Sequence, residues 1–367
     1  MKQFSSLEIH YLIKELQFLI NSKVDQIYHP SKKELIIQLY VTNQGKRILK
    51  ITPKIFFLTE TRQQTKNPSQ FCLFLRKYLI NSRLTAIKQL EFERIVQFDF
   101  KTKDQTYSLI LELFSTGNII FSKNSQILMA AEHQKWKQRT IAPKQTYSYP
   151  KKEYNFLELK EKDLKTLLQK TNKENLVKAL AIDLGLGGLF AEESCLLSKI
   201  NKNKKPKQTT DQEIASLIKT FKNLKTKKIN PQIIYKNKEI EDITPFKLEF
   251  YKNLKQESFK IYNQLLDFYF SKQTTSIQKQ KFRLQLEKIQ KIIQKQKSDI
   301  STSEKSIQEN HKKAELIYQN YNLIKDVMEQ INKATKKYTW KEIKEKLKGH
   351  KIIKEINPKD KTIVLEL

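Results

Sequence analysis

Three of the six glycines of the chain lie close together, at Gly185, Gly187 and Gly188. They separate two apolar stretches of helical character, residues 176–181 and 190–195. A helix, a tight glycine turn and a second helix form the layout of a helix-hairpin-helix, whose exposed backbone N–H groups hold a phosphate without reading bases. A plain turn between helices that needs glycine for positive φ has the same pattern. The lysine-rich stretch that follows favours phosphate binding.

Two other pairs of neighbouring residues could contact RNA. Arg76 and Lys77 follow Phe74 on a predicted helix, where the cations could contact phosphate while the aromatic side chains pack. A solvated helix face is the alternative for this pair. Glu93 and Arg94 stand at the start of a predicted strand. There the guanidinium can bind a phosphate and the carboxylate a base or a ribose hydroxyl, although such a pair is usually a solvated strand edge.

The residue patterns of common enzyme active sites are absent from the sequence. It contains no P-loop, no GxGxxG after a strand, no GxSxG and no HExxH. The five histidines are scattered, and Cys72 and Cys195 are far apart, so neither residue type has the spacing of a metal site. We therefore expect no catalytic residues, no metal and no cofactor, and a protein that is not an enzyme in its own right.

The net charge indicates the class of partner. The 367 residues include 70 Lys and Arg against 39 Asp and Glu, which gives a formal net charge of +31. A charge this large concentrates polyanions, of which nucleic acid is the commonest. Codon usage that favours lysine is the alternative, but it does not explain the deficit of Asp and Glu. The two unpaired cysteines, the lack of a signal-peptide core and the lack of an apolar run of about 20 residues predict a cytoplasmic protein without a membrane span.

The elements that must position these residues change in character along the chain. Residues 1–150 read mostly as strands that are short, β-branched or aromatic, and separated by polar breaks. Two helices interrupt the strands, so we expect an α+β domain, a sandwich or half-barrel flanked by helices. The strands are predicted at 34–41, 47–51, 55–58, 95–100, 107–113 and 118–121, and the helices at 6–19 and 71–79.

The remainder of the chain is predicted to be helical until its last residues. Residues 151–240 form the domain with the helix-hairpin-helix, and residues 241–337 read as long helices whose apolar residues alternate three and four apart. Ser301 to Glu304 has the form of a capping box, so either a helical hairpin turns there or one helix runs through. Residues 338–367 end in two short strands. The coiled-coil seam is predicted at Phe282, Leu286, Ile289, Ile293 and Ile300.

Several of these segments occur in an order that resembles the NFACT family of ribosome-associated quality-control factors, formerly described as fibronectin-binding proteins. The resemblance extends over nearly the whole chain and implies an N-terminal domain with the fold of the formamidopyrimidine-DNA glycosylases, with residues 338–367 as the start of a middle domain. The segments that carry it are Ser6-Leu7-Glu8, Phe71 to Leu79, Glu93 to Val96, Leu111 to Ile120, Arg139 to Tyr147, the glycine turn within Leu176 to Glu193, Ala314 to Asn320, and Trp340 to Ile343.

The resemblance implies binding to large ribosomal subunits that are obstructed by peptidyl-tRNA. It also implies recruitment of charged tRNA, alanyl-tRNA in bacteria and archaea, for template-free C-terminal tailing of the stalled peptide. The family residues for tRNA handling are an acid early in the first helix and an acid–arginine pair before the Ile-Val strand. They fall on Glu8, Glu93 and Arg94, where Glu replaces the Asp of the family at both acidic positions.

Family members usually continue past the position of Leu367 with a returning coiled-coil helix and an RNA-binding domain. We therefore expect a fragment or one half of a split protein, whose seam pairs with a separately encoded C-terminal half or with a second copy. The rival readings are a DNA-glycosylase-like enzyme and a basic coiled-coil RNA-binding adaptor without tailing activity. The glycosylases use an N-terminal proline amine, which a chain that begins Met1-Lys2-Gln3 lacks. The adaptor has no need of Glu8, Glu93, Arg94 or the glycine turn.

Overall fold

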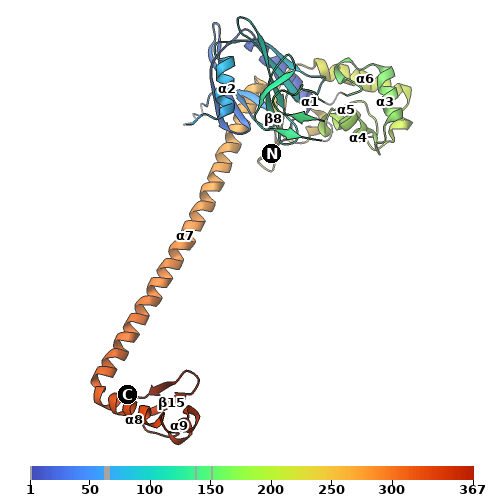
Figure 1. Ribbon diagram of the computed structural model, residues 1–367. Coiled ribbons are helices and arrows are strands. Elements are labelled where there is room, and N and C mark those ends of the chain that lie inside the picture. Colours follow the sequence, from blue (N-terminus) through green and yellow to red (C-terminus); the bar gives the residue numbers. More distant parts are fainter. Residues whose placement is uncertain (1, 62–66, 137–138, 150–151) are drawn as a thin grey trace. The chain divides into compact units, whose positions relative to one another are not determined.

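The computed structural model describes residues 2–61, 67–136, 139–149 and 152–367, with the backbone alone at 273–281. It divides into two compact units, residues 1–274 and 275–367 (Figure 1). The candidate RNA-binding residues all belong to the first unit, and the predicted coiled-coil seam belongs to the second.

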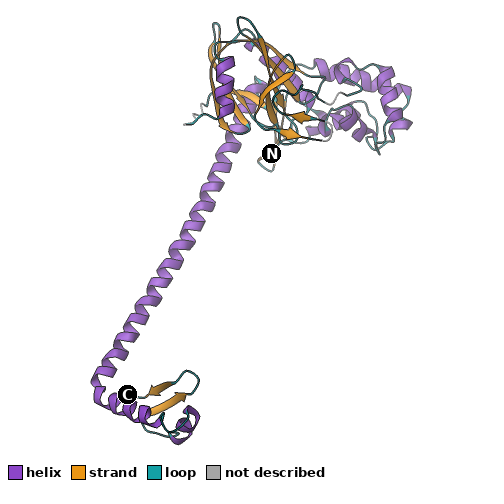
Figure 2. Cartoon of the chain, in the orientation of Figure 1, coloured by secondary structure: helices purple, strands orange, loops and turns teal. Residues whose placement is uncertain are grey.

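A nine-stranded antiparallel sheet forms the centre of the first unit (Figure 2). Its strand order is β4-β3-β2-β1-β5-β6-β7-β8-β9, and the two halves meet where β1 pairs with β5 at Lys23 and Arg83. The run Leu35 to Leu39 in β2 is aliphatic apart from Gln38 and is buried at every position, which suits a strand covered on both faces. The strands are β1 (Lys23–Ser31), β2 (Glu34–Val41), β3 (Gly45–Ile51), β4 (Phe56–Thr59), β5 (Arg83–Gln89), β6 (Ile95–Lys101), β7 (Thr106–Glu112), β8 (Asn118–Lys123) and β9 (Gln126–Ala130).

Two helices pack on this sheet. In α2 (Gln70–Leu79), Phe71, Cys72, Leu75 and Leu79 are buried in the same core as the strands, and the helix contacts both β1 and β9. The sheet therefore curves around α2. In α1 (Ser6–Glu15), followed by the 3-10 turn η1 (Leu16–Leu19), one face packs on the sheet while the opposite face packs on a second, helical core.

That second core belongs to a group of helices beside the sheet (Figure 1). Leucines at helical spacing on α3 and α6 bury one face of each helix against α5. The elements are η2 (Phe156–Glu158), α3 (Glu161–Lys170), α4 (Leu176–Lys178), the π-helical turn η3 (Ala179–Asp183), α5 (Gly188–Leu197), η4 (Pro206–Gln208), α6 (Asp211–Thr226) and η5 (Glu249–Tyr251). Two small sheets complete the unit: β10 (Gln134–Lys135) with β11 (Thr140–Ile141), and β13 (Glu239–Thr244), β12 (Gln232–Lys236) and β14 (Lys255–Ser258) in that order.

A single helix, α7 (Tyr262–Gln319), begins in the first unit and ends in the second. The Glu15 carboxylate accepts hydrogen bonds from the backbone N–H groups of Tyr262 (2.8 Å) and Asn263 (2.7 Å), which caps the start of the helix. The side-chain amide of Asn263 hydrogen-bonds both the N–H and the carbonyl of Leu58 in β4. The first turns of α7 are thereby part of the first unit's core.

The second unit has a small core of its own beyond the end of α7. It is formed by Val327, Ile331, Ile343, Ile353 and Ile356. These residues lie on α8 (Tyr321–Ala334), α9 (Trp340–Lys346) and the hairpin of β15 (Ile353–Asn357) and β16 (Thr362–Leu365).

The strands and helices predicted before residue 130 are confirmed, and β1, β5 and β9 were missed. Where a sandwich or half-barrel was predicted, the strands form one curved antiparallel sheet. The boundary predicted at 150/151 falls on residues outside those that the structure describes. The long helices predicted for residues 241–337 are present as α7 and α8, but they begin at Tyr262 and not at residue 241, because β13 and β14 occupy the start of this range.

The capping-box pattern at Ser301 does not end a helix, because α7 runs through it. The three-and-four spacing of apolar residues also stops being one helix face at Asn320, where α7 ends and α8 follows. Ile331 on α8 packs in the small core of the second unit and not on the seam. Within the described part of this chain no second helix covers the predicted seam: Phe282, Leu286, Ile289, Ile293 and Ile300 are 64%, 60%, 53%, 45% and 58% exposed. A heptad pattern determines which helix face is apolar and not whether a partner covers it.

Candidate functional site

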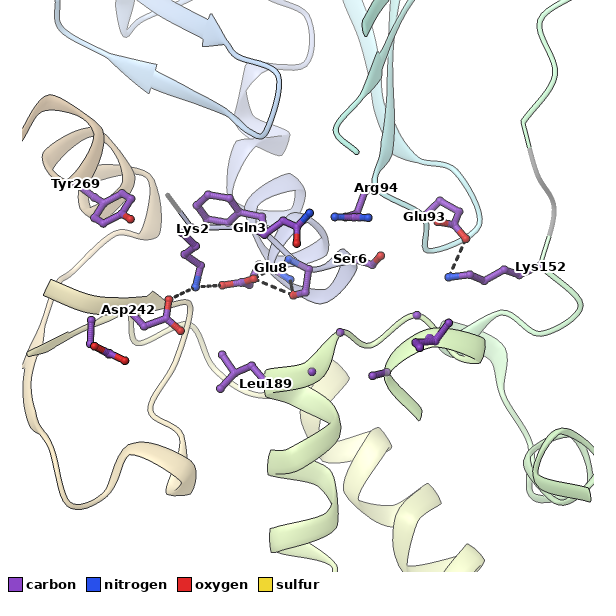
Figure 3. A pocket seen from close by; sticks show the side chains of 18 of the residues that line it. Lys2, Gln3, Ser6, Glu8, Glu93, Arg94, Lys152, Leu189, Asp242 and Tyr269 are labelled. Carbon is purple, nitrogen blue, oxygen red and sulfur yellow. Dashed lines mark hydrogen bonds and ion pairs between the residues drawn. The ribbon is translucent and has the colours of Figure 1, made fainter. Parts of the chain in front are cut away.

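A cavity of about 790 Å³ lies in the first unit where several segments converge (Figure 3). They include the N-terminal segment, the start of α1, the loop before β6, the glycine turn before α5, and β13. Six of the eight residues predicted to bind RNA line it: Glu8, Glu93, Arg94, Gly185, Gly187 and Gly188. Positions nearly two hundred residues apart in the sequence are thus brought to one surface.

The loop before β6 turns Glu93 and Arg94 towards this cavity. Glu91 and Phe92 adopt positive φ values of 45° and 58°, a conformation that bulky residues rarely adopt. The Phe92 ring is 2% exposed and packs 4.7 Å from the Phe156 ring, in the helical core. Burial of this ring holds the strained turn in place, and strain of this kind is commonly retained at functional sites.

Arg94 is a half-buried cation facing the cavity, at its upper side beside Gln3 in Figure 3. Within the described part of the chain, neither a hydrogen bond nor an ion pair engages its guanidinium. Burial lowers the pKa of Arg94, and the charge of Glu93 opposes that change. Because an arginine side chain has a very high ordinary pKa, the group stays charged at neutral pH. A guanidinium with five donors and no protein acceptor is suited to bind an anion.

Glu93 is paired with a residue that the sequence did not single out. Lys152 Nζ lies 2.8 Å from Glu93 Oε1, with the two side chains 25% and 20% exposed. The Lys152 ammonium also lies against the glycine turn: a Cβ on Gly185 would be only 2.1 Å from Lys152 Nζ. The carboxylate of Glu93 is therefore neutralised by lysine and leaves Arg94 free to attract a negative group.

The glycine turn places the N-terminus of α5 on the cavity. Gly187 is the N-cap residue with φ +77°, and a Cβ there would lie 3.3 Å from the Cβ of Ser5. The first N–H groups of a helix have no partner within the helix, and no side chain caps those of α5 among the described residues. Gly188 and Leu189 line the cavity, so these N–H groups and the positive end of the helix dipole face it.

A buried ion-pair network closes the opposite side of the cavity. Lys2 Nζ lies 2.6 Å from Glu8 and 2.5 Å from Asp242, and the three side chains are 8%, 2% and 14% exposed. Lys2 also donates to the carbonyl of Ile243. The other Glu8 oxygen accepts from the N–H and hydroxyl of Ser5, in the capping box of α1. Glu8 thus lines the cavity with both carboxylate oxygens engaged.

Protonation in this network is governed by burial and by charge. Burial raises the pKa of Glu8, and the Lys2 ammonium opposes the rise. For Lys2, burial favours the neutral amine, but the carboxylates of Glu8 and Asp242 outweigh it and raise the pKa. Lys2 is therefore a charged structural cation and not a free amine.

Arg76 and Lys77 lie away from the cavity, on α2. Arg76 Nε donates to the carbonyl of Ile27 (2.8 Å), and its guanidinium lies 5.6 Å from the centre of the Tyr28 ring. Lys77 is exposed, with its ammonium 5.5 Å from the Tyr78 ring. The structure gives Arg76 a role in packing, and RNA binding by this pair stays a prediction.

Lys2, Lys152 and Asp242 are the site residues that sequence reasoning missed. Asp242 comes from β13 and Lys152 from the segment before η2, and no local pattern marks either one. Among the described residues, no group of His, Cys, Asp and Glu could hold a metal ion. In the same part of the chain, every helix is too short or too polar to cross a bilayer.

The fold is shared with solved proteins of low sequence identity. The N-terminal part of the fibronectin/fibrinogen-binding protein from Streptococcus suis superimposes with a TM-score of 0.60 and 23% identity, covering 74% of this chain and 100% of that one. The fibrinogen-binding protein from Staphylococcus aureus also has a TM-score of 0.60, with 20% identity over 72% of this chain and 98% of that one. These likenesses define the class of fold.

Residues 5–364 match the NFACT N-terminal and middle domains, and the chain belongs to this family. It is similar to the archaeal Rqc2 homolog aRqcH of Methanocaldococcus jannaschii, with 30% identity over 100% of this chain and 58% of the relative. A ribosome quality control complex subunit NEMF homolog of Drosophila melanogaster is 29% identical over 57% of this chain and 22% of that protein. The chain spans little more than half the length of the archaeal relative.

Proposed function

We propose that this protein is an RNA-binding factor of ribosome-associated quality control and that the cavity binds a phosphate group of tRNA. The observation that carries the proposal is the pairing of two anion-binding features on one cavity. Arg94 supplies a charged guanidinium without a recorded acceptor among the described residues, and the uncapped N-terminus of α5 supplies backbone donors. Both bind phosphate through geometry and charge, without reading a base.

The names of the relatives and the net charge of +31 support the wider role. In that role the protein binds large ribosomal subunits that carry peptidyl-tRNA, in the cytoplasm. It recruits charged tRNA, alanyl-tRNA first among the candidates, for template-free C-terminal tailing of the stalled peptide. Recruitment needs only that RNA be held and oriented, which is what cations and helix N-termini do.

We also propose that the protein is not an enzyme in its own right. Two of the described lysines line the cavity: the Lys2 amine is buried between two carboxylates that keep it protonated, and the Lys152 ammonium is paired with Glu93, so neither is a free amine that could attack a sugar carbon. Incubation with oxidised DNA in borohydride is expected to trap no covalent adduct. A trapped adduct would establish a glycosylase-like activity instead.

The apolar face of α7 supports a proposal about partners. Its five seam residues are exposed, and soluble proteins seldom leave a continuous stripe of this kind uncovered. We infer that a second helix covers the seam, supplied by a separately encoded C-terminal half of the same family or by a second copy of this chain.

The proposed RNA site is tested by removing Arg94, the lining cation that has no partner among the residues the structure describes. Arg94→Ala is expected to weaken tRNA binding by about 10- to 100-fold, the usual value of a hydrogen bond to a charged group, and to leave urea unfolding nearly unchanged. Arg47→Ala is the matched control, because Arg47 is a half-buried arginine whose recorded bond is to its neighbour's carbonyl, far from the cavity lining. If both variants bind tRNA equally well, Arg94 does not bind phosphate, and the proposal fails.

A further inference from the structure

A second group of cations lies in the first unit outside the cavity lining, where α1 meets the end of α6. Lys14 Nζ donates to the carbonyl of Lys225 (2.9 Å), and Lys225 Nζ donates to the carbonyl of Leu157 (2.9 Å). Lys227 Nζ donates to the carbonyl of Lys247 (2.7 Å). Lys222, one turn before Lys225 on α6, is exposed.

Aromatic rings hold these lysine side chains in place. The ammonium of Lys14 lies 5.2 Å from the Tyr11 ring, and that of Lys225 lies 4.9 Å from the Phe156 ring. The ammonium of Lys227 lies 4.9 Å from the ring of Phe246, which packs 5.0 Å from Tyr11. The charges of Lys14, Lys225 and Lys227 are therefore gathered on one packed framework, and exposed Lys222 lies one turn away on α6. These four residues are here called the α1–α6 lysine cluster.

The lysines of this cluster lack the acidic partners that three other lysines of the helical group have. Lys165 pairs with Asp211, Lys170 with Glu153, and Lys178 with Glu174. No ion pair is formed by any lysine of the cluster with a described carboxylate. Among these four cations, the recorded bond of Lys14 alone caps a carbonyl at the end of α6, so capping does not explain the other three. Each ammonium has three donors, and the carbonyl bonds of Lys14, Lys225 and Lys227 use one apiece.

Burial and the positive charge of the cluster together lower the pKa of groups that lie between its lysines. The pKa of His10 falls to about 4 because the ring is buried and lies near Lys14 and Lys225. Burial and the charge of Lys222 lower the pKa of Lys225. An anion placed over the cluster would relieve this repulsion.

We propose that the α1–α6 lysine cluster is a second RNA-binding surface, which holds the phosphate backbone of a strand outside the cavity. The inference rests on the proposed function, since it assigns a further contact to the same RNA. Lysine binds phosphate as a point charge, and side chains already fixed against rings lose little freedom on binding. Contacts of this kind position the RNA and carry no sequence information.

The test is the salt dependence of tRNA binding by the full chain. Each phosphate contact releases condensed counterions, so log K falls against log salt with a slope of about 0.7 to 0.9 per contact. The triple variant Lys14→Gln, Lys222→Gln, Lys227→Gln is expected to reduce the steepness of that slope by about two. It leaves Lys225 intact, whose bond to Leu157 helps to hold the fold.

The matched control is Lys165→Gln, Lys170→Gln, Lys178→Gln. It removes the same charge from the same helical group, but from lysines that already have carboxylate partners, so the slope is expected to change by less than about 0.5. Equal slopes for the two triple variants would overturn the inference, because diffuse charge would then explain binding. If urea unfolding shows that the triple cluster variant is poorly folded, Lys222→Gln alone is measured. Its expected change in the salt slope is about 0.7 to 0.9.

The outcomes separate this inference from the proposed function. If Arg94→Ala weakens tRNA binding while the cluster variant keeps the parent slope, the cavity binds RNA and the cluster does not. If the parent protein binds no tRNA, both proposals fail. Vesicles containing phosphatidylserine form the second arm: loss of vesicle binding in the cluster variant, with an unchanged tRNA slope, would assign the surface to a membrane and contradict an RNA contact.

Discussion

The Lys2 ammonium and the Glu8 carboxylate lie 2.6 Å apart with almost no exposure to solvent. Asp242 lies on the other side of the same ammonium, at 2.5 Å. One lysine therefore joins the N-terminal segment, α1 and β13, and these three segments form one side of the cavity. The shape of that side depends on a single buried positive charge.

Replacement of Lys2 by methionine is expected to lower the free energy of unfolding by about 3 to 5 kcal/mol, because two carboxylates stay buried without their counter-charge. Urea unfolding measures the loss. The double variant Lys2→Met, Glu8→Gln is expected to recover part of it, since one of the stranded charges is gone. If Lys2→Met alone is as stable as the parent, the network contributes nothing to the fold.

The loss in Lys2→Met is also expected to depend on pH. Burial raises the pKa of Glu8, and without Lys2 nothing as strong opposes that rise. The folded state then favours the neutral carboxyl, so stability decreases as pH rises from the unfolded value of 4.5 through the raised folded value. The deficit relative to the parent should be smaller at about pH 5 than at about pH 8. A deficit that is constant over this interval would contradict the assignment.

Gly187→Ala is expected to cost about 1 to 2 kcal/mol, because an L-residue is strained at φ +77° and its Cβ would press on the Cβ of Ser5. tRNA binding should weaken as well, since the start of α5 would move. Gly188→Ala is the control: a Cβ there meets nothing within 4 Å, and alanine favours a helix by about 0.5 to 1 kcal/mol over glycine. Equal melting temperatures for the two variants would rule out a constrained turn.

The exposed seam of α7 is expected to make the chain self-associate or bind its separate partner. Light scattering should give a mass above 43.7 kDa at high concentration. Leu286→Glu with Ile293→Glu should return the monomer, because carboxylates within an apolar contact are costly to bury. The control, Lys288→Glu with Lys295→Glu, changes exposed polar positions on the same helix. A parent that stays monomeric, alone and beside a candidate C-terminal half, would remove the basis for a helical partner.

Glu15→Ala is expected to loosen the start of α7 and to cost about 0.5 to 2 kcal/mol, the value of a lost helix cap. Hydrogen exchange of the Tyr262 and Asn263 amides should accelerate, because the carboxylate that accepts from both is removed. Glu158→Ala, at an exposed position, is the comparison. Unchanged protection of these two amides in Glu15→Ala would show that packing alone holds the helix.

Local sequence patterns predicted the elements that are locally distinctive. β2 and β6 to β8 are continuous β-branched and aromatic runs, and they were found. β1 was missed because it contains Pro30 and Asp25, and only Val24, Ile27 and His29 of its residues are buried. A strand of this kind is held by its neighbours' hydrogen bonds, which no periodicity records.

The residues of the cavity likewise fall into those with a local sequence signal and those without one. Arg94 and the glycine turn have local signals, an acid–arginine pair before a strand and three clustered glycines. Asp242 and Lys2 meet across 240 residues of sequence, so neither has a signal in its own neighbourhood. Sequence alone also could not show that both oxygens of Glu8 are engaged within the protein, which leaves Arg94 as the group available to RNA.

The way α7 starts limits where this protein can be shortened. Tyr262, Leu265 and Leu266 are fully buried in the core that the sheet shares with α1 and α2. A version trimmed after β14 would lose those three side chains and the partner of Glu15 together, and would open the sheet core to water. Any minimal RNA-binding fragment for crystallisation or titration must therefore include α7 through Phe270, even though the helix takes no part in the cavity before Tyr269.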